Sequence, residues 1–234
     1  MTGPGAGKGR KRRGPRTASG RRRAEKRRLD RLLALEREYW EAGIRWIAGV
    51  DEVGRGPLAG PVLAAAVILP PGVAIRGVDD SKRLSAERRE SVFQVIRSQA
   101  LCIGVGAAST REIDRLNILR ATWLAMQRAV GHLSVRPERI IIDGLPVPVF
   151  GEEHRAVVDA DAHVHCVACA SVVAKVVRDR LMQRLAPRYP GYGWDENRGY
   201  ATAEHRNAII ALGMTPHHRR SFETDMQFDF DLFD

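Results

Sequence analysis

The residues of this chain that could do chemistry are acids placed directly after short apolar segments. Asp51 and Glu52 follow the apolar segment 47–50, and Asp143 follows the apolar segment 140–142. Aspartate is a poor strand former, and a carboxylate beside a buried apolar run needs a partner or a cation to offset its lost hydration. If both segments are strands of one sheet, their ends lie along one edge and the three acids converge there.

Converging carboxylates are suited to hard divalent cations. Mg²⁺ and Mn²⁺ prefer carboxylate and water oxygens, and two such ions about 4 Å apart promote phosphodiester hydrolysis. Neighbouring strand residues point to opposite faces, so Asp51 and Glu52 can reach one ion only if the strand ends or bulges there. Whether Glu52 would contribute its side chain or its carbonyl stays open. Taken singly, each acid could instead cap or form a turn, and Asp-Gly at 143–144 is a common turn.

A fourth acid is harder to choose, because three aspartates compete. These are Asp159, Asp161 and Asp179. Asp179 follows Lys175 by four residues in a predicted helix, so an intrahelical ion pair explains it without a metal.

The hydrophobic pattern predicts the elements that would position these acids. Strands are expected at 46–53, 61–69, 101–108, 139–142 and 156–158. Helices are expected at 22–41, 86–99, 118–133, 164–185 and 203–212, with a short helix after Thr110. Ser85, Thr110 and Thr202 are the predicted N-caps. Three strands come first and later strands alternate with helices, which indicates an α/β fold with a mixed sheet flanked by helices.

The positive charge of the chain lies almost wholly at its N-terminus. Residues 1–31 hold 13 Lys and Arg against two acids, whereas residues 32–234 hold 25 basic and 26 acidic residues. We therefore predict a disordered basic tail over 1–31, a folded domain over 32–224 and an acidic tail over 225–234. The tail could touch nucleic acid electrostatically, or it could only aid solubility.

Composition excludes several other classes. No apolar run approaches the length of a membrane span, and the basic N-terminus lacks the apolar core of a secretory signal. Three cysteines do not suggest a disulfide framework, so a cytoplasmic setting is expected. Cys166 and Cys169 form a lone C-x-x-C in an apolar helix, which favours buried small residues over a zinc site. His217 and His218 fit scaffold roles better than ligand roles.

Seven segments, taken together, resemble the ribonuclease HII family. The segment 48–62 is similar to its first motif and 80–85 to its D-S-K-x-L-S segment. Four further segments match in order: 113–119, 142–144, 170–179 and 199–202, followed by 217–222 near the C-terminus. The resemblance covers about 47–222 and implies a ribonuclease H-like mixed sheet with a C-terminal helical extension.

The resemblance also implies a set of site residues. The four metal-binding carboxylates of the family fall on Asp51, Glu52, Asp143 and Asp161. Spacing favours Asp161 over Asp159, although segment 158–161 departs from the usual K-G-D or K-A-D. The cofactor implied is a pair of divalent ions, Mn²⁺ or Mg²⁺.

Substrate contacts are carried over in the same way. The turn formed by Gly54, Arg55 and Gly56 is expected to contact the 2′-hydroxyl of the scissile ribonucleotide, the group that distinguishes RNA from DNA. Tyr200 is expected to pack on the sugar of the following deoxynucleotide. Three further residues are expected to contact phosphates or brace the site: Lys82, Ser171 and Lys175.

The function implied is that of an endonuclease acting on RNA–DNA hybrids and on duplex DNA with embedded ribonucleotides. It would cut 5′ to the ribonucleotide and leave 3′-hydroxyl and 5′-phosphate ends, with the chain acting as a monomer. Type 3 ribonuclease H is the nearest enzyme alternative, but it carries a folded N-terminal domain for which this tail is too short and polar. A non-catalytic hybrid-binding protein is the alternative of another class, and it leaves the acids at strand ends unexplained.

Overall fold

The computed structural model describes residues 17–78, 81 and 84–222. Its strands form one sheet in the order β3-β2-β1-β4-β5. The strands are β1 (Ile47–Val53), β2 (Val62–Ile68), β3 (Cys102–Ala108), β4 (Arg139–Asp143) and β5 (His154–Val157). β1 pairs antiparallel with β2 and parallel with β4, so the sheet is mixed and β1 lies at its centre.

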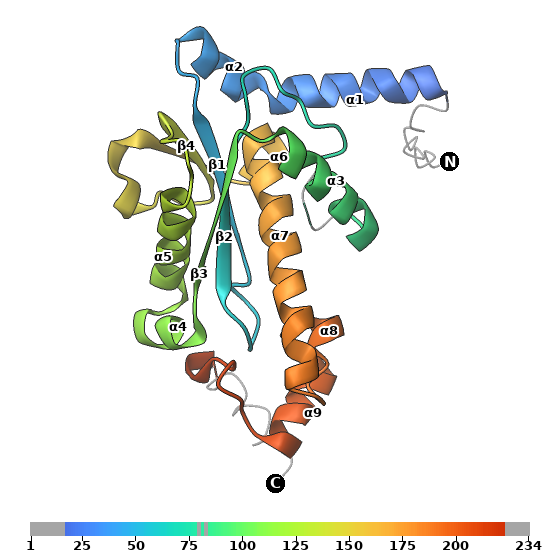
Figure 1. Ribbon diagram of the computed structural model, residues 1–234, viewed down its shortest axis with the longest axis vertical. Helices are drawn as coiled ribbons and strands as arrows, with labels where there is room; N and C mark the ends of the chain where they lie inside the picture. Colours follow the sequence, from blue (N-terminus) through green and yellow to red (C-terminus); the bar gives the residue numbers. More distant parts are fainter. Residues whose placement is uncertain (1–16, 79–80, 82–83, 223–234) are drawn as a thin grey trace, which may run out of the picture.

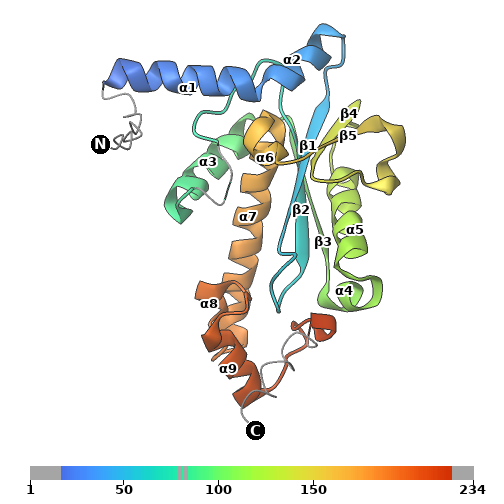
Figure 2. The ribbon, with the colours of Figure 1, turned by 180° about the vertical axis from the view of Figure 1, so that it is seen from behind.

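The helices described are listed here in chain order. They are α1 (Ala18–Leu32), α2 (Ala34–Glu41), α3 (Ala86–Gln99), α4 (Thr110–Leu116), α5 (Ile118–Gly131), α6 (Ala160–His163), α7 (His165–Leu185), α8 (Trp194–Asn197) and α9 (Ala203–Leu212), with short 3₁₀ turns at 148–153, 186–188 and 220–222. α5 covers one face of the sheet, and α7, with α3 beside it, covers the other (Figure 1). In the view from behind, α1 lies at one end of the sheet, and α8 and α9 lie at the opposite end (Figure 2).

Burial on both faces explains the composition of the central strands. All seven residues of β2 are buried, because α7 packs on one face and α5 on the other. α7 and α5 lie so close to the sheet that there is no room for a side chain at Gly49 of β1 or at Gly104 of β3. A Cβ at Gly49 would lie 2.2 Å from the backbone carbon of Cys166, and one at Gly104 would lie 2.0 Å from the carbonyl oxygen of Ala129.

The predicted fold class is confirmed, and most predicted elements agree within two residues at each end. The bounds predicted for α3 and α9 match the structure, as do the caps Ser85 and Thr202. Thr110 was predicted as a cap, but the cap is Ser109, whose hydroxyl and backbone form a reciprocal pair with Glu112. The short helices α6 and α8 were not predicted.

The helix predicted over 22–41 corresponds to α1 and α2, whereas the disordered tail predicted over 1–31 is wrong for residues 18–31, because α1 begins at Ala18. The Thr17 hydroxyl accepts the Gly20 N–H at 3.1 Å, and Glu25 pairs with Arg28 one turn later. Leu29 and Leu32 enter the core beside α3 and α7, and that burial stabilises the helix. Residues 1–16 and the predicted acidic tail 225–234 lie outside the described residues.

α2 supplies a cap for α7 that lies far away in the sequence. The Glu36 side chain is 2 % exposed and accepts the backbone N–H groups of His165 and Cys166, each at 3.2 Å. Val164, the residue before α7, provides no side-chain cap. A carboxylate at a helix N-terminus satisfies orphan donors and complements the helix dipole. The N-terminal helices are therefore integrated with the helix that crosses the sheet.

Glu36→Gln is expected to remove a pH dependence of stability. Burial raises the pKa of Glu36 to about 7, above its unfolded value, so its contribution to stability is full below the unfolded pKa and is lost as pH rises to about 7. The loss amounts to about 3 kcal/mol at most, at 1.36 kcal/mol per pKa unit. Urea denaturation at acidic and mildly alkaline pH measures it. The variant should match the wild type at low pH and exceed it at high pH, and a pH-independent difference would contradict the assignment.

The two cysteines of the C-x-x-C are free and buried on α7, as predicted. Burial raises the pKa of both thiols well above the ordinary value. No described helix combines the length and apolar character that a membrane crossing needs.

Candidate active site

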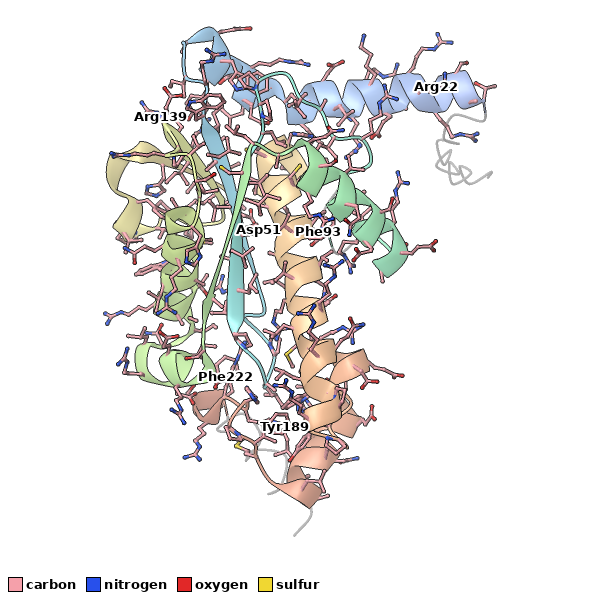
Figure 3. The ribbon with its side chains drawn as sticks, in the orientation of Figure 1. Arg22, Asp51, Phe93, Arg139, Tyr189 and Phe222 are labelled. Atoms are coloured by element: carbon pink, nitrogen blue, oxygen red, sulfur yellow. The ribbon has the colours of Figure 1, made fainter. Side chains whose placement is uncertain are left out.

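The parallel pairing of β1 and β4 brings the strand-end acids to one place. Val50 lies beside Ile142 in the register, so Asp51 and Asp143 follow at the same level of the sheet. Figure 3 shows Asp51 between the sheet and α7. The strand does not end or bulge at Glu52, since its pairing with β2 continues regularly through Val53. Asp51 therefore faces α7, and Glu52 projects to the other side.

Asp51 is held by polar groups although it is only 6 % exposed. Its carboxylate accepts the Glu52 N–H at 2.8 Å, and the Ser171 hydroxyl of α7 lies near it and acts to lower its pKa. The Ser171 hydroxyl donates to the Ser81 hydroxyl at 2.9 Å. Ser171 thus lies between the buried carboxylate and Ser81, which precedes α3.

The three acids oppose one another's ionisation. Burial raises the pKa of Asp51 well above its ordinary value, and the charges of Glu52 and Asp143 raise it further. Burial also raises the pKa of Glu52, with Arg55 acting against it and Asp143 adding to it. Like charges in a poorly hydrated place are stabilised by a cation. The donor set, all carboxylate oxygen, fits Mg²⁺ or Mn²⁺.

Asp161 is attached to this group through α6. The Ala160 N–H donates to Asp143 Oδ1 at 2.7 Å, and Asp161 is the next residue, 8 % exposed. Asp159 is exposed and adopts the left-handed conformation (φ 54°). Glu52 pairs with Arg55 at 3.4 Å. Over the described residues, no three His, Cys, Asp or Glu side chains form a group that could hold an ion as they stand.

The turn of Gly54, Arg55 and Gly56 begins two residues after Glu52, at the end of β1. Gly54 has φ +90°, and a Cβ there would lie 2.2 Å from Arg178 Nε, so the fold itself requires glycine. Gly56 is exposed, and a Cβ there would meet nothing within 4 Å. The packing of the chain therefore gives no reason for glycine at 56, and Arg55 is likewise exposed.

Two buried arginines support this turn through backbone carbonyls. Arg178 of α7 is fully buried and donates to the carbonyl oxygens of Ala59, Pro61 and Arg198 at 3.0–3.1 Å. Burial lowers the pKa of its guanidinium. Sequence reasoning placed Arg178 in a motif but gave it no role. The structure makes it the residue that ties α7 to the chain after the turn.

Arg219 performs the same task from the C-terminal part. It is also fully buried and donates to the carbonyl oxygens of Gly54, Arg55 and Gly60. Its guanidinium lies 5.1 Å from the centre of the Phe222 ring. Burial and the nearby charge of Arg178 lower its pKa to about 9. The sequence predicted a scaffold role for the segment 217–222. It did not indicate that this segment supports the turn of Gly54, Arg55 and Gly56.

Tyr200 lies next to the same turn. The carbonyl of the preceding Gly199 accepts the N–H groups of Leu58 and Ala59 at 2.8 and 3.2 Å. The ring of Tyr200 has the Arg178 guanidinium 6.0 Å from its centre and remains 42 % exposed. An exposed ring that is held at one side can accept a stacked sugar or base.

The other residues considered in the sequence differ in what the structure shows of them. The Lys175 ammonium bonds to Asp179 at 2.7 Å, as its spacing predicted, and Asp179 also attracts Arg89 and Arg198. Lys82 lies outside the described residues. His218 is buried against His205, with 3.1 Å between their Nε2 atoms, in line with a scaffold role.

Comparison with known proteins gives a consistent family. The family model described as ribonuclease HII matches residues 48–225. Proteins named ribonuclease HII from Ruegeria pomeroyi and Geobacillus kaustophilus are 54% and 50% identical, over 76% and 86% of this chain and 76% and 77% of their own lengths.

Solved structures agree. The ribonuclease H2 of Pyrococcus horikoshii has a TM-score of 0.66 at 27% identity, over 80% of this chain and 98% of that one. The Archaeoglobus fulgidus structure of a PCNA:RNase HII complex has a TM-score of 0.65 at 28% identity, over 75% and 94%. A ribonuclease HIII solved with Mn²⁺ shares the fold at 21% identity, with a TM-score of 0.61 over 80% and 70%.

Proposed function

This chain belongs to the ribonuclease HII family and is an endoribonuclease, and we propose that it cuts RNA–DNA hybrids and the 5′ side of ribonucleotides embedded in duplex DNA. The products would be 3′-hydroxyl and 5′-phosphate ends. The chain would act as a monomer on duplex nucleic acid.

One observation supports the proposal most strongly: the buried Asp51 and the partly buried Asp143, at the ends of two parallel strands, lie level with each other beside an exposed glycine turn. Asp51 and Asp143 lie level on β1 and β4, and Gly54–Gly56 continues the same strand. Asp51, Asp143 and Asp161 would hold divalent Mg²⁺ or Mn²⁺. Glu52 starts from the other face of β1 and would join them through its carbonyl, or through its side chain, which lies near enough to Asp143 for that charge to raise its pKa. The bound ions would activate water and stabilise the leaving oxygen.

The turn supplies the discrimination between ribose and deoxyribose. Its backbone is fixed by Arg219, which leaves the exposed Gly56 free to approach a sugar without a Cβ in the way. A 2′-hydroxyl both donates and accepts hydrogen bonds, so backbone groups of a rigid turn can read it.

The deciding experiment is cleavage of a DNA duplex that contains one ribonucleotide. We expect cutting 5′ to the ribonucleotide with Mg²⁺ or Mn²⁺, none with EDTA, and none on the all-DNA duplex. A purified, folded sample that leaves the ribonucleotide duplex intact with either ion refutes the proposal. A product set with 2′,3′-cyclic ends would refute metal-assisted attack by water.

Tyr200→Ala is expected to erode the preference for RNA-to-DNA junctions. The ring would no longer stack on the sugar after the cut, a contact worth about 1–3 kcal/mol by analogy with base stacking. We expect kcat/KM to fall about 10-fold on a single-ribonucleotide duplex and to change little on a long RNA–DNA hybrid. Tyr200→Phe, which keeps the ring, should behave as wild type. An equal loss on both substrates argues against the role.

Asp161→Asn and Asp159→Asn separate the two candidates for the fourth acid. Asp161 is buried next to the residue that bonds Asp143, whereas Asp159 is exposed. Asn tolerates the left-handed conformation of residue 159, so this variant should fold and cut within about twofold of wild type. Asp161→Asn should lower kcat by about 10²-fold or more, in line with several kcal/mol from metal-assisted chemistry. The reverse pattern would move the assignment to Asp159.

A further inference from the structure

A groove lies between α1, the segment 72–77 and the first turn of α3, away from the candidate active site. It has a volume of about 970 Å³. Basic side chains dominate its lining: Arg21, Arg22, Arg23, Lys26, Arg76 and Arg88. All six are exposed. Figure 3 shows Arg22 towards the outer end of α1.

The two acids that line the groove, Glu25 and Asp30, already form ion pairs with arginines outside the six basic residues above. Glu25 pairs with Arg28 at 2.9 Å and accepts the Gly77 N–H at 2.9 Å, while Asp30 pairs with Arg37 at 2.8 Å. Within the ranges 17–78, 81 and 84–222, none of the six basic residues forms an ion pair. The groove therefore presents uncompensated positive charge, which is the electrostatic requirement for a polyanion.

The arrangement of α1 favours a polyanion in water over a membrane surface. Surface-bound helices insert an apolar face between lipids. In α1 the apolar side chains are buried in the core of the protein. Leu29 and Leu32 are 7 % and 3 % exposed, and they belong to the same core cluster as Ile75 and Val78. The outward side of the helix offers arginine and lysine without an apolar face.

The groove is joined to the candidate active site by a short chain of contacts. The Ser171 hydroxyl lies near the Asp51 carboxylate and donates to the Ser81 hydroxyl at 2.9 Å. Arg89 donates to the Ser81 carbonyl at 2.9 Å, and its neighbour Arg88 lines the groove. Ser81 and Arg88 thus connect the two regions at the start of α3.

We infer that this groove binds the phosphate backbone of the duplex being cut, several base pairs away from the scissile bond. The inference rests on the proposed function for the identity of the ligand. A helix of 15 residues is about 22 Å long, which matches about six base pairs at 3.4 Å each. Contacts with phosphates carry affinity without sequence preference.

The test compares duplex lengths with the full chain. Arg22→Gln, Lys26→Gln and Arg76→Gln are combined in one variant, because Gln keeps helix propensity while removing charge. The matched control combines Arg111→Gln, Arg115→Gln and Arg120→Gln, which are exposed residues of α4 and α5 without ion pairs among the described residues. Binding is measured by fluorescence anisotropy in EDTA over a salt series, on single-ribonucleotide duplexes of about 10 and about 40 base pairs, so that only the longer one spans both regions.

We expect the groove variant to bind the long duplex about 10-fold more weakly or worse, with a slope of log K against log salt smaller by about three. The affinity of the groove variant for the short duplex and its rate of cleaving that duplex should stay within about twofold of wild type. The control variant should match the wild type within the same factor in affinity and cleavage at both duplex lengths.

Unchanged affinity for the long duplex, or equal losses at both lengths, overturns the inference. Binding to phosphatidylserine vesicles that depends on the same three residues, with duplex binding unaffected, would also overturn it. Loss of cleavage of the short duplex by the wild type would refute the proposed function instead.

Discussion

Asp51→Asn is expected to lower kcat on a single-ribonucleotide duplex by about 10³-fold or more, since metal-assisted stabilisation is worth several kcal/mol and each 1.36 kcal/mol is a factor of ten. The Kd for the uncut duplex should change little, because Asp51 is only 6 % exposed and faces α7. Single-turnover cleavage and anisotropy binding measure the two quantities separately.

The same substitution should not destabilise the protein. Asn keeps an oxygen that can accept the Glu52 N–H and removes a carboxylate from a group of acids that raise one another's pKa. We expect the free energy of unfolding in EDTA to be unchanged or higher. Asp195→Asn, at an exposed acid of α8, serves as the control and should alter neither quantity. A variant of Asp51 that still cuts at the wild-type rate, or one that loses binding and kcat in parallel, contradicts the assignment.

Arg219→Ala is expected to have the largest effect on stability, about 3–5 kcal/mol. The guanidinium donates to three carbonyl oxygens of the chain that forms and follows the turn. Removing it strands buried acceptors, at about 1–3 kcal/mol each. Urea denaturation in EDTA measures the change, so that loss of metal binding does not contribute.

Two neighbouring variants sharpen this prediction. Arg219→Lys should restore little, because one ammonium cannot replace a planar fork that reaches Gly54, Arg55 and Gly60 together. Arg220→Ala, at the adjacent exposed residue, should stay within about 0.5 kcal/mol of wild type. A stable Arg219→Ala protein with normal junction preference would show that the turn does not depend on this arginine.

The strand-end acids could be predicted because their signal is local. An aspartate after an apolar strand is conspicuous wherever it occurs, and the bounds of β1 and β4 were predicted within one residue. The pair Lys175–Asp179 was predicted from helical spacing alone. Family motifs then supplied what the pattern left open, including the preference for Asp161.

The supports of the site could not be predicted, because they depend on contacts between distant parts of the chain. An arginine in a sequence indicates a solvated surface, yet Arg178 and Arg219 are fully buried among carbonyl groups. Glu36 caps a helix that begins 129 residues later. A helix was predicted over 22–41, yet residues 1–31 were also assigned to a disordered tail because they have few apolar residues; the helix forms because Leu29 and Leu32 enter the core.

The position of β1 at the centre of the sheet has a consequence for how the protein is made. Its pairing with β2 needs only the nearby chain, whereas its pairing with β4 brings residues 50 and 142 together. Pairings between distant strands form slowly, because the entropy cost of closing a large loop comes before the favourable contacts are made. While the chain is being synthesised, the first three strands can assemble with one side of β1 still bare. The nascent protein would therefore carry an inactive half-sheet with an exposed edge until β4 emerges from the ribosome, and that interval is when it is most open to aggregation.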